Sequence, residues 1–251
     1  LGDSPVGYAH VRSAKVPAEP TDMFFDLANF FEKNREKAKQ AGVTVKADER
    51  FGVSAYANAG PDRSLIPQVF RQRQVAQYLL DALFAAHPSQ LVSLQRERPR
   101  TNDQMAALAA GKAPAPTAGE NSSTPNPDLF EIDPRISARV PGFVDASAFR
   151  ITFLGETESL RTLLNKLAAF ELPLVVRSVE VEPASSSTGA NTPAAVAAPA
   201  NSLSAIFGTI PGAAATKPTE PVKPKPLVAK TLSKFTVTIE MIDLVSTTPT
   251  G

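Results

Sequence analysis

The clearest alternation of hydrophobic and polar positions lies within residues 148–183. Apolar side chains occupy every second position of 149–153, which is typical of a strand with one buried face. Leucines then recur at helical spacing over 160–167, so a short helix there has one apolar stripe and one polar side. After Pro173 the stretch 174–182 has the pattern of an extended strand. This order of strand, helix and strand predicts part of a two-layer α/β sandwich.

The first part of the chain shows a similar series of patterns. Helical periodicity predicts a helix over 21–41 that stops at Gly42. A longer helix is predicted from about residue 64 to residue 87, with Pro67 near its start. The strands predicted in this part are 43–46, 51–57 and 89–98.

Two segments of the chain, 79–99 and 163–183, align without a gap. They share three leucines, one alanine and the final proline, which favours an internal repeat. Each repeat has a helix, a strand, a long connection and a closing strand, the latter at 148–154 and at 234–245. Two such units make a ferredoxin-like sandwich. The residues expected in the core of the second unit are Leu160, Leu163, Leu164, Leu167, Phe149, Ile151, Phe153, Val237 and Ile239.

The patterned segments are separated by long connections rich in alanine, proline, serine and threonine. Such tracts bury too little apolar surface to offset chain entropy, so we expect them to be flexible. The predicted fold class is α+β, with two ferredoxin-like α/β sandwich lobes, mainly antiparallel sheets and long flexible insertions between strands. The expected parts are a flexible tail (1–19), a first α/β lobe (20–98), an Ala/Pro-rich connection (99–146), a second α/β lobe (147–245) containing the flexible insertion 183–229, and a tail (246–251).

Phenylalanine is concentrated in the helix predicted over 21–41. Phe24 and Phe31 share a stripe with a leucine and an alanine, whereas Phe25 and Phe30 lie off that stripe. Two interpretations are open. The four side chains either form one wide buried stripe, or some of them face the second lobe or a partner molecule. We therefore take Phe24, Phe25, Phe30 and Phe31 as the candidate interface.

Composition and charge exclude several classes of function. The 26 basic and 25 acidic residues nearly cancel, so no overall field favours nucleic acid. Cysteine is absent, which removes thiol catalysis, disulfides and thiolate zinc sites. The two histidines, His10 and His87, lie in a tail and at a helix end, so no metal cage or catalytic triad is predicted. We expect no enzyme activity, no cofactor and no metal site.

The segment 149–160, Phe-Arg-Ile-Thr-Phe-Leu-Gly-Glu-Thr-Glu-Ser-Leu, carries a family resemblance that continues through Leu163 to Val181. It resembles the strand, helix entry and exit strand of PilO-like pilus-alignment proteins. In particular it is similar to the pilus-associated outer-membrane proteins of Akkermansia and its verrucomicrobial relatives. The layout of 25–98 and the Ala/Pro-rich insertion before the last strand are similar as well.

The resemblance implies a non-enzymatic structural or interaction protein of the cell envelope. Such a protein would serve a type IV pilus or type II secretion-like assembly, at the periplasmic face or in the outer membrane. The implied partners are a second copy in a homodimer, or PilN-like and secretin-like assembly proteins, with no nucleic acid. Relatives carry an upstream transmembrane helix, and because this chain begins at Leu1 we expect membrane attachment through an N-terminal segment absent from it. The alternative is a surface-exposed binding protein that recognises a host receptor or a glycan.

Overall fold

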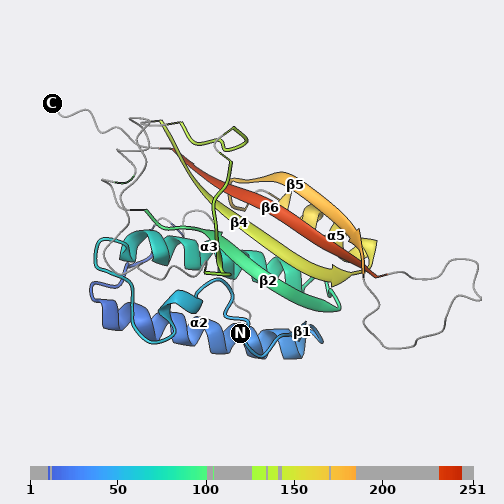
Figure 1. The fold of residues 1–251 in the computed structure, drawn as a ribbon, viewed down its shortest axis with the longest axis horizontal. Helices are drawn as coiled ribbons and strands as arrows, with labels where there is room; N and C mark the ends of the chain where they lie inside the picture. The colour runs from blue at the N-terminus through green and yellow to red at the C-terminus, as the bar shows by residue number, and fades with distance from the viewer. Residues whose placement is uncertain are drawn as a thin grey trace, which may run out of the picture. The chain divides into compact units, whose positions relative to one another are not determined.

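The computed structural model describes residues 11, 13–100, 104, 126–133, 135–140, 143–169, 171–184 and 232–244. Its helices and strands follow one another in the order shown in Figure 1. They are α2 (Pro20–Gln40), β1 (Thr44–Val45), the 3₁₀ helix η1 (Ser54–Tyr56), α3 (Ile66–Phe84), β2 (Gln90–Glu97), β3 (Leu129–Phe130), β4 (Val144–Gly155), α5 (Thr157–Leu167), β5 (Leu174–Pro183) and β6 (Ser233–Leu244).

One mixed sheet joins the strands in the order β1-β2-β4-β6-β5, and β3 also pairs with β2. Strand β4 runs antiparallel to both of its neighbours, so that Ile151 lies opposite Leu94 on one side and Val237 on the other. Strand β5 is antiparallel to β6, whereas β1 and β3 are parallel to β2. The four long strands in Figure 1 therefore form an antiparallel sheet that two short parallel strands extend.

The predicted repeat is confirmed by this topology. The first unit is α3, β2 and β4, and the second is α5, β5 and β6, each with the order helix, strand, strand. The closing strands β4 and β6 pair with each other at the centre, while β2 and β5 lie outside them, as in a ferredoxin-like sandwich. Both outer strands carry an irregularity near their start, between Leu91 and Ser93 in β2 and between Val176 and Ser178 in β5.

The fold class α+β is confirmed, but the division into two lobes needs correction. Strand β2 was expected in the first lobe and β4 in the second, yet they pair from Gln90 to Arg96 within one sheet. All described elements fall within one compact unit. The two repeats are thus the two halves of a single sandwich, because each repeat contributes only two of the four long strands. A sheet of two strands could not bury a core of its own.

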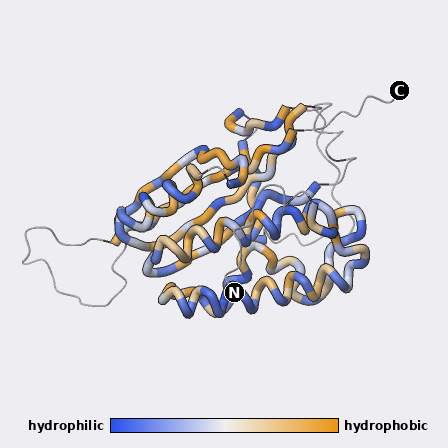
Figure 2. Tube along the Cα trace, turned by 180° about the vertical axis from the view of Figure 1, so that it is seen from behind, coloured by the Kyte–Doolittle hydropathy of each residue, from blue (hydrophilic) through white to orange (hydrophobic). Residues whose placement is uncertain are grey.

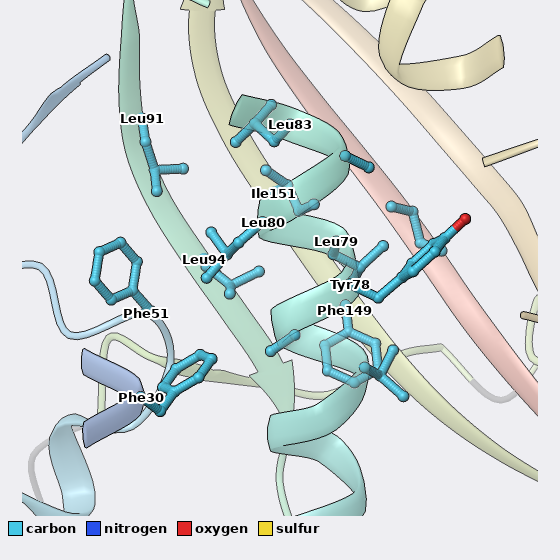
Figure 3. Packing of buried hydrophobic residues seen from close by; sticks show 14 of the residues in the cluster. Phe30, Phe51, Tyr78, Leu79, Leu80, Leu83, Leu91, Leu94, Phe149 and Ile151 are labelled. Atoms are coloured by element: carbon cyan, nitrogen blue, oxygen red, sulfur yellow. The ribbon is translucent and has the colours of Figure 1, made fainter. Parts of the chain in front are cut away.

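The helices pack beside one another, with α3 in contact with both α2 and α5. The buried side chains of α3 meet those of β2 and β4 in the core shown in Figure 3, where Leu80 and Leu94 lie together and Phe51 lies near Phe30. In the hydropathy view of Figure 2, apolar and polar positions alternate along each helix. No described helix combines the length and hydrophobicity needed to cross a bilayer.

The end of α2 explains how the chain turns into the sheet. Gly42 has a φ of 71°, which glycine adopts without the steric cost that a side chain would bring. Its amide donates to the Lys39 carbonyl at 3.1 Å, and the Val43 amide donates to the Ala38 carbonyl at 2.9 Å. This pair of bonds is the Schellman arrangement, and it confirms the predicted stop at Gly42.

The prediction of a strand over 51–57 is wrong. Phe51 has a φ of 53° and is buried, and the chain after it forms η1. The amide of Phe51 donates to the Glu49 carboxylate at 2.8 Å, which stabilises a turn in place of an extended backbone. Alternating apolar residues are present here because Phe51 and Val53 both enter the core from a loop.

The predicted core of the second unit is confirmed for its strands and corrected for its helix. Phe149, Ile151, Phe153, Val237 and Ile239 are all fully buried. In α5 the buried positions are Ser159, Leu163 and Leu167, whereas Leu160 and Leu164 are half-buried. The buried stripe is narrower than predicted because α3 is the one described helix that packs beside α5.

Parts of the predicted tails and connections fall among the described residues. Val11 is buried in the core, so the tail expected over 1–19 contributes to packing at that point. The connection expected over 99–146 contains β3 and the start of β4, because strands of two residues leave no periodic signal. The insertion 183–229 beyond residue 184 and the tail 246–251 lie outside the described residues.

Candidate functional site

The described residues contain no group of three or more His, Cys, Asp or Glu side chains that could hold a metal ion. His87 follows α3 with a φ of 47°, and its Nδ1 atom lies 3.3 Å from the Ala41 carbonyl oxygen. This contact ties the end of α3 to the end of α2. The features that stand out are the phenylalanines of α2, two buried carboxylates and the two outer edges of the sheet.

The candidate interface residues of α2 do not share one environment. Phe30 and Phe31 are 1% and 7% exposed, and their rings lie 6.3 and 6.0 Å from the ring of Phe51. Phe24 is half-buried, and Phe25 is 59% exposed. Phe30 and Phe31 were thus wrongly placed in an interface, since they fill the core of this chain. An interface role for Phe25, with Phe24 beside it, stays a prediction.

The predicted stripe of α2 is confirmed at Leu27 and Phe31, whereas Phe24 is half-buried and Ala28 is exposed. The buried residues are Met23, Leu27, Phe30, Phe31, Asn34 and Ala38. On the other side of Phe31 lies a shallow cavity of about 120 Å³, and the Arg50 guanidinium stacks over the Phe31 ring at 4.5 Å. The residues that line this cavity are Phe24, Leu27, Ala28, Phe31, Glu32, Arg50, Val53, Tyr56 and Ala57.

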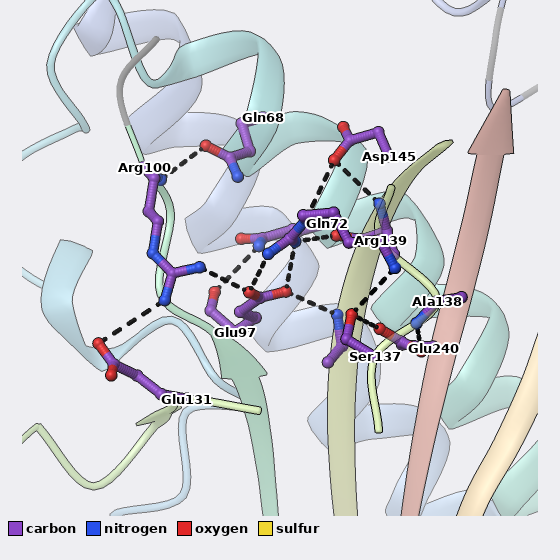
Figure 4. Close-up of polar contacts among 12 residues, drawn as sticks. Gln68, Gln72, Glu97, Arg100, Glu131, Ser137, Ala138, Arg139, Asp145 and Glu240 are labelled. Atoms are coloured by element: carbon purple, nitrogen blue, oxygen red, sulfur yellow. Dashed lines mark hydrogen bonds and ion pairs between the residues drawn. The ribbon is translucent and has the colours of Figure 1, made fainter. Parts of the chain in front are cut away.

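A network of buried charges lies at one end of the sheet (Figure 4). Glu97 of β2 is 3% exposed and accepts two hydrogen bonds of 2.9 Å from the Arg139 guanidinium. Arg100 donates a further bond of 3.0 Å to the same carboxylate, and the amide of Ala148 donates one of 3.2 Å. Burial alone would lower the pKa of Arg139, but its bonds to Glu97 and the nearby carboxylates raise it above the ordinary value.

A second buried carboxylate lies on β6, which pairs with β4 on the side away from β2. Glu240 is completely buried and accepts hydrogen bonds from the Ser137 hydroxyl, from the Ala138 amide at 3.0 Å and from Arg177 Nε at 2.6 Å. Together, Glu97 and Glu240 fasten the described part of the connection between β2 and β4 to the sheet. Charge-assisted bonds of this kind are among the strongest that side chains make.

The fastened segment presents an apolar tip. Val140 and Val144 exchange backbone hydrogen bonds of 3.0 and 2.9 Å, which hold a tight turn at the start of β4. Phe143 in this turn is 70% exposed, and Leu244, which pairs with Val144, is 67% exposed. Large apolar side chains exposed together are unusual on a protein surface that contacts only water.

The outer edge of β2 is met by other parts of the chain at three places. Strand β1 pairs with it at Gln90 and Leu91, and β3 pairs with it at Arg96 and Glu97. Between these two strands the Glu49 carboxylate accepts from the amide of Leu94 at 3.5 Å. The amide of Arg96 also donates to the Asp128 carbonyl at 2.9 Å, so groups of the same chain meet this edge near its start, its middle and its end.

Glu49 is an acid in an unusual environment. Burial raises its pKa from 4.5 to about 7, and the nearby carboxylates of Asp128 and Asp48 act in the same direction. The amides of Phe51 and Leu94, which donate to it, act in the opposite direction. The closed edge therefore contains a carboxyl group that takes up a proton near neutral pH.

The outer edge of β5 is different, because no described strand pairs with it. Val176, Val179 and Val181 are 37%, 39% and 58% exposed. Their partners on β6 are Ile239, Val237 and Phe235, which are buried on the helix side of the sheet. The three valines therefore face the helix side at the sheet edge, where α5 does not cover them. The alternation Ser-Val-Glu-Val-Glu of 178–182 carried the sequence signal for a strand exposed in this way.

Solved structures with the same fold come from Akkermansia muciniphila. A crystal structure of the core domain of a protein from this organism has 11% identity and a TM-score of 0.53, over 94% of each chain. A second crystal structure has 11% identity and a TM-score of 0.55, over 94% of this chain and 83% of that one. A third, of a protein without its transmembrane region, has 11% identity and a TM-score of 0.53, over 92% and 89%.

Among curated proteins, the sequence has no match. A family model described as pilus-like matches residues 8–241, which include every helix and nearly every strand residue described above. A match of this extent covers both repeated units and the connections between them. The chain therefore belongs to this pilus-like family.

Proposed function

We propose that the chain is a PilO-like structural component of a type IV pilus or of a type II secretion-like assembly. The observation that carries this proposal is the match of the pilus-like family model over residues 8–241. The ferredoxin-like sandwich with its repeated units supports it, since the sequence resembled PilO-like proteins in these same segments. By itself, the family match supports a pilus-related protein. A location in the cell envelope is consistent with such a protein.

In this role the chain acts through contacts with other proteins and carries out no chemical reaction. We propose a second copy, a PilN-like protein or a secretin-like protein as its partners. A similar structure from Akkermansia muciniphila was determined without the transmembrane region of that protein. This supports the proposal that an N-terminal segment outside the present sequence attaches the domain to a membrane, with the domain at the periplasmic face or at the outer membrane.

A deletion of the gene in the organism of origin tests the assembly role. The expected result is a loss of surface pili in electron micrographs, restored by the full-length gene. Fractionation should find the full-length protein with the membranes. Its domain should be digested by protease only after the outer membrane is opened. Normal pili in the deletion strain would contradict the assembly role, and digestion on intact cells would favour a surface-exposed binding protein.

A further inference from the structure

We propose that β5 is a docking edge for a second copy of this chain, with the two β5 strands antiparallel about a two-fold axis at Val179. The two sheets would then join into one. This inference rests on the proposed function only in that it names one partner of the assembly role. It is carried by the geometry of the edge itself.

The two outer strands of the sheet differ in what meets their outer sides. The donors of β2 are met by β1, by Glu49 and by β3, whereas no described strand meets the outer side of β5. An uncovered edge has a row of free amide and carbonyl groups that pair readily with another strand. The neighbouring side chains are also apolar, which favours a protein strand over water as the occupant.

The row formed by Val176, Val179 and Val181 is complementary to a second copy of itself. Arg177 is the extra residue of the irregularity in β5, so Val176 and Val181 each lie two strand positions from Val179. Antiparallel pairing about Val179 places Val179 against its copy. It also places each Val181 against the Val176 of the other molecule. The six valines then form one continuous apolar strip on the helix side, which is the self-complementarity that a two-fold interface requires.

Charged and polar side chains on the opposite side of β5 favour the same register. With the axis at Val179, Glu180 of one molecule faces the Ser178 hydroxyl of the other, which can donate a hydrogen bond to it. An axis at Glu180 would place two carboxylates opposite each other, which is destabilising. Arg177 is already bonded to the buried Glu240 at 2.6 Å. The side chains of β5 thus favour pairing with a second copy of the strand, in the register centred on Val179.

The register can be tested with single cysteines, because the chain contains no cysteine of its own. In Val179→Cys the two Cα atoms across the axis would lie about 4.5 to 5.5 Å apart, within the range that a disulfide spans. In Val181→Cys they would lie about 14 Å apart, since four strand positions separate them. We expect Val179→Cys to form a disulfide dimer under mild oxidation and Val181→Cys to form little. A mixture of Val176→Cys and Val181→Cys should give the mixed dimer.

Sedimentation of the purified chain at tens of micromolar provides an independent measurement. The edge contact buries less than the roughly 1,600 Å² of a standard interface, so we expect a weak, concentration-dependent dimer. Val179→Lys should abolish it, since it places two charges at the axis. Val16→Lys is the matched control, because Val16 is 40% exposed and lies outside β5. Circular dichroism should show that both variants fold.

Equal cross-linking of Val179→Cys and Val181→Cys would overturn the proposed register. A monomer at all concentrations would overturn the docking edge for a second copy. If that monomer protects the β5 amides from hydrogen exchange, another segment of the same chain covers the edge. None of these results depends on pilus assembly in cells, so the pairing can fail while the proposed function holds.

Discussion

The two repeated units share a topology, but they end the sheet in different ways. At β2 the chain adds β1, the Glu49 carboxylate and β3, and these groups meet the backbone along the outer edge. At β5 no described strand does so, and Val176, Val179 and Val181 are left partly exposed. Among the described residues, one unit therefore has an edge met by its own chain, whereas the edge of the other has no paired strand.

The helices of the two units differ in the same direction. Helix α3 contacts α2 on one side and α5 on the other, and most of its residues are buried. Helix α5 has one described helix beside it and buries only Ser159, Leu163 and Leu167. Because α2 packs on α3, the helix of the first repeat lies at the centre of the core. In the second unit Leu160 and Leu164 of α5 stay half-buried.

The largest difference between the units is expected for their acidic residues. Glu97→Ala should lower the free energy of unfolding by about 3 to 5 kcal/mol, because it removes the buried carboxylate that pairs with the half-buried Arg139 and Arg100. Glu182→Ala in β5 should cost between about 0 and 1 kcal/mol, because its pair with Lys234 is exposed to solvent. Urea unfolding of the two variants measures the difference, and similar losses for both would break the comparison.

Equivalent leucines of the two helices give a second test. Leu80 and Leu164 occupy the same position of the repeat, but Leu80 is completely buried and Leu164 is half-buried. Leu80→Ala should cost about 2 to 5 kcal/mol. Leu164→Ala should cost less, because the removed side chain is already partly in water. A larger loss of stability for Leu164→Ala would show that α5 is packed as tightly as α3.

The closed edge should also make stability depend on pH. The pKa of Glu49 is 4.5 in the unfolded chain and about 7 in the fold, so the folded state keeps a proton that the unfolded state has lost. Its contribution to stability is complete below pH 4.5 and is lost as the pH rises towards 7. The full loss is about 3 kcal/mol.

Glu49→Gln is the variant that isolates this contribution. Glutamine keeps an acceptor for the amide of Phe51 but does not ionise, so the fall in stability between pH 4.5 and pH 7 should be smaller in the variant. Urea unfolding of both proteins across this range is the measurement. Parallel curves for the two proteins would show that the fold does not raise the pKa of Glu49.

Local periodicity predicted much of the fold. The alternation in β4 and β6 and the leucine spacing in α5 gave the type of each element, and the repeat gave their common order. The pairing of β2 with β4 was missed because alternation shows which residues are buried, and not which strand lies beside which. In α2 the adjacent pairs Phe24-Phe25 and Phe30-Phe31 fit two overlapping stripes, and packing against Phe51 selects the one that contains Phe30.

The site was harder to predict than the fold. Acidic residues in strands are usually solvated, so nothing marked Glu97 or Glu240 as buried. The partner that neutralises Glu97 is Arg139, which is distant in the sequence and lies in a segment without periodicity. The stretch 174–182 was predicted to be an extended strand, which β5 confirms. That this strand lies at an uncovered edge follows only from the order of the strands.

Hydrogen exchange of β2 and β5 tests the central claim, which is that one edge is closed and the other open. In dilute solution the amides of Gln90–Glu97 should be protected throughout, whereas roughly every second amide of Leu174–Pro183 should exchange rapidly. At high protein concentration the fast amides of β5 should become protected, and those of β2 should not change. Equal protection of both strands in dilute solution would contradict this account.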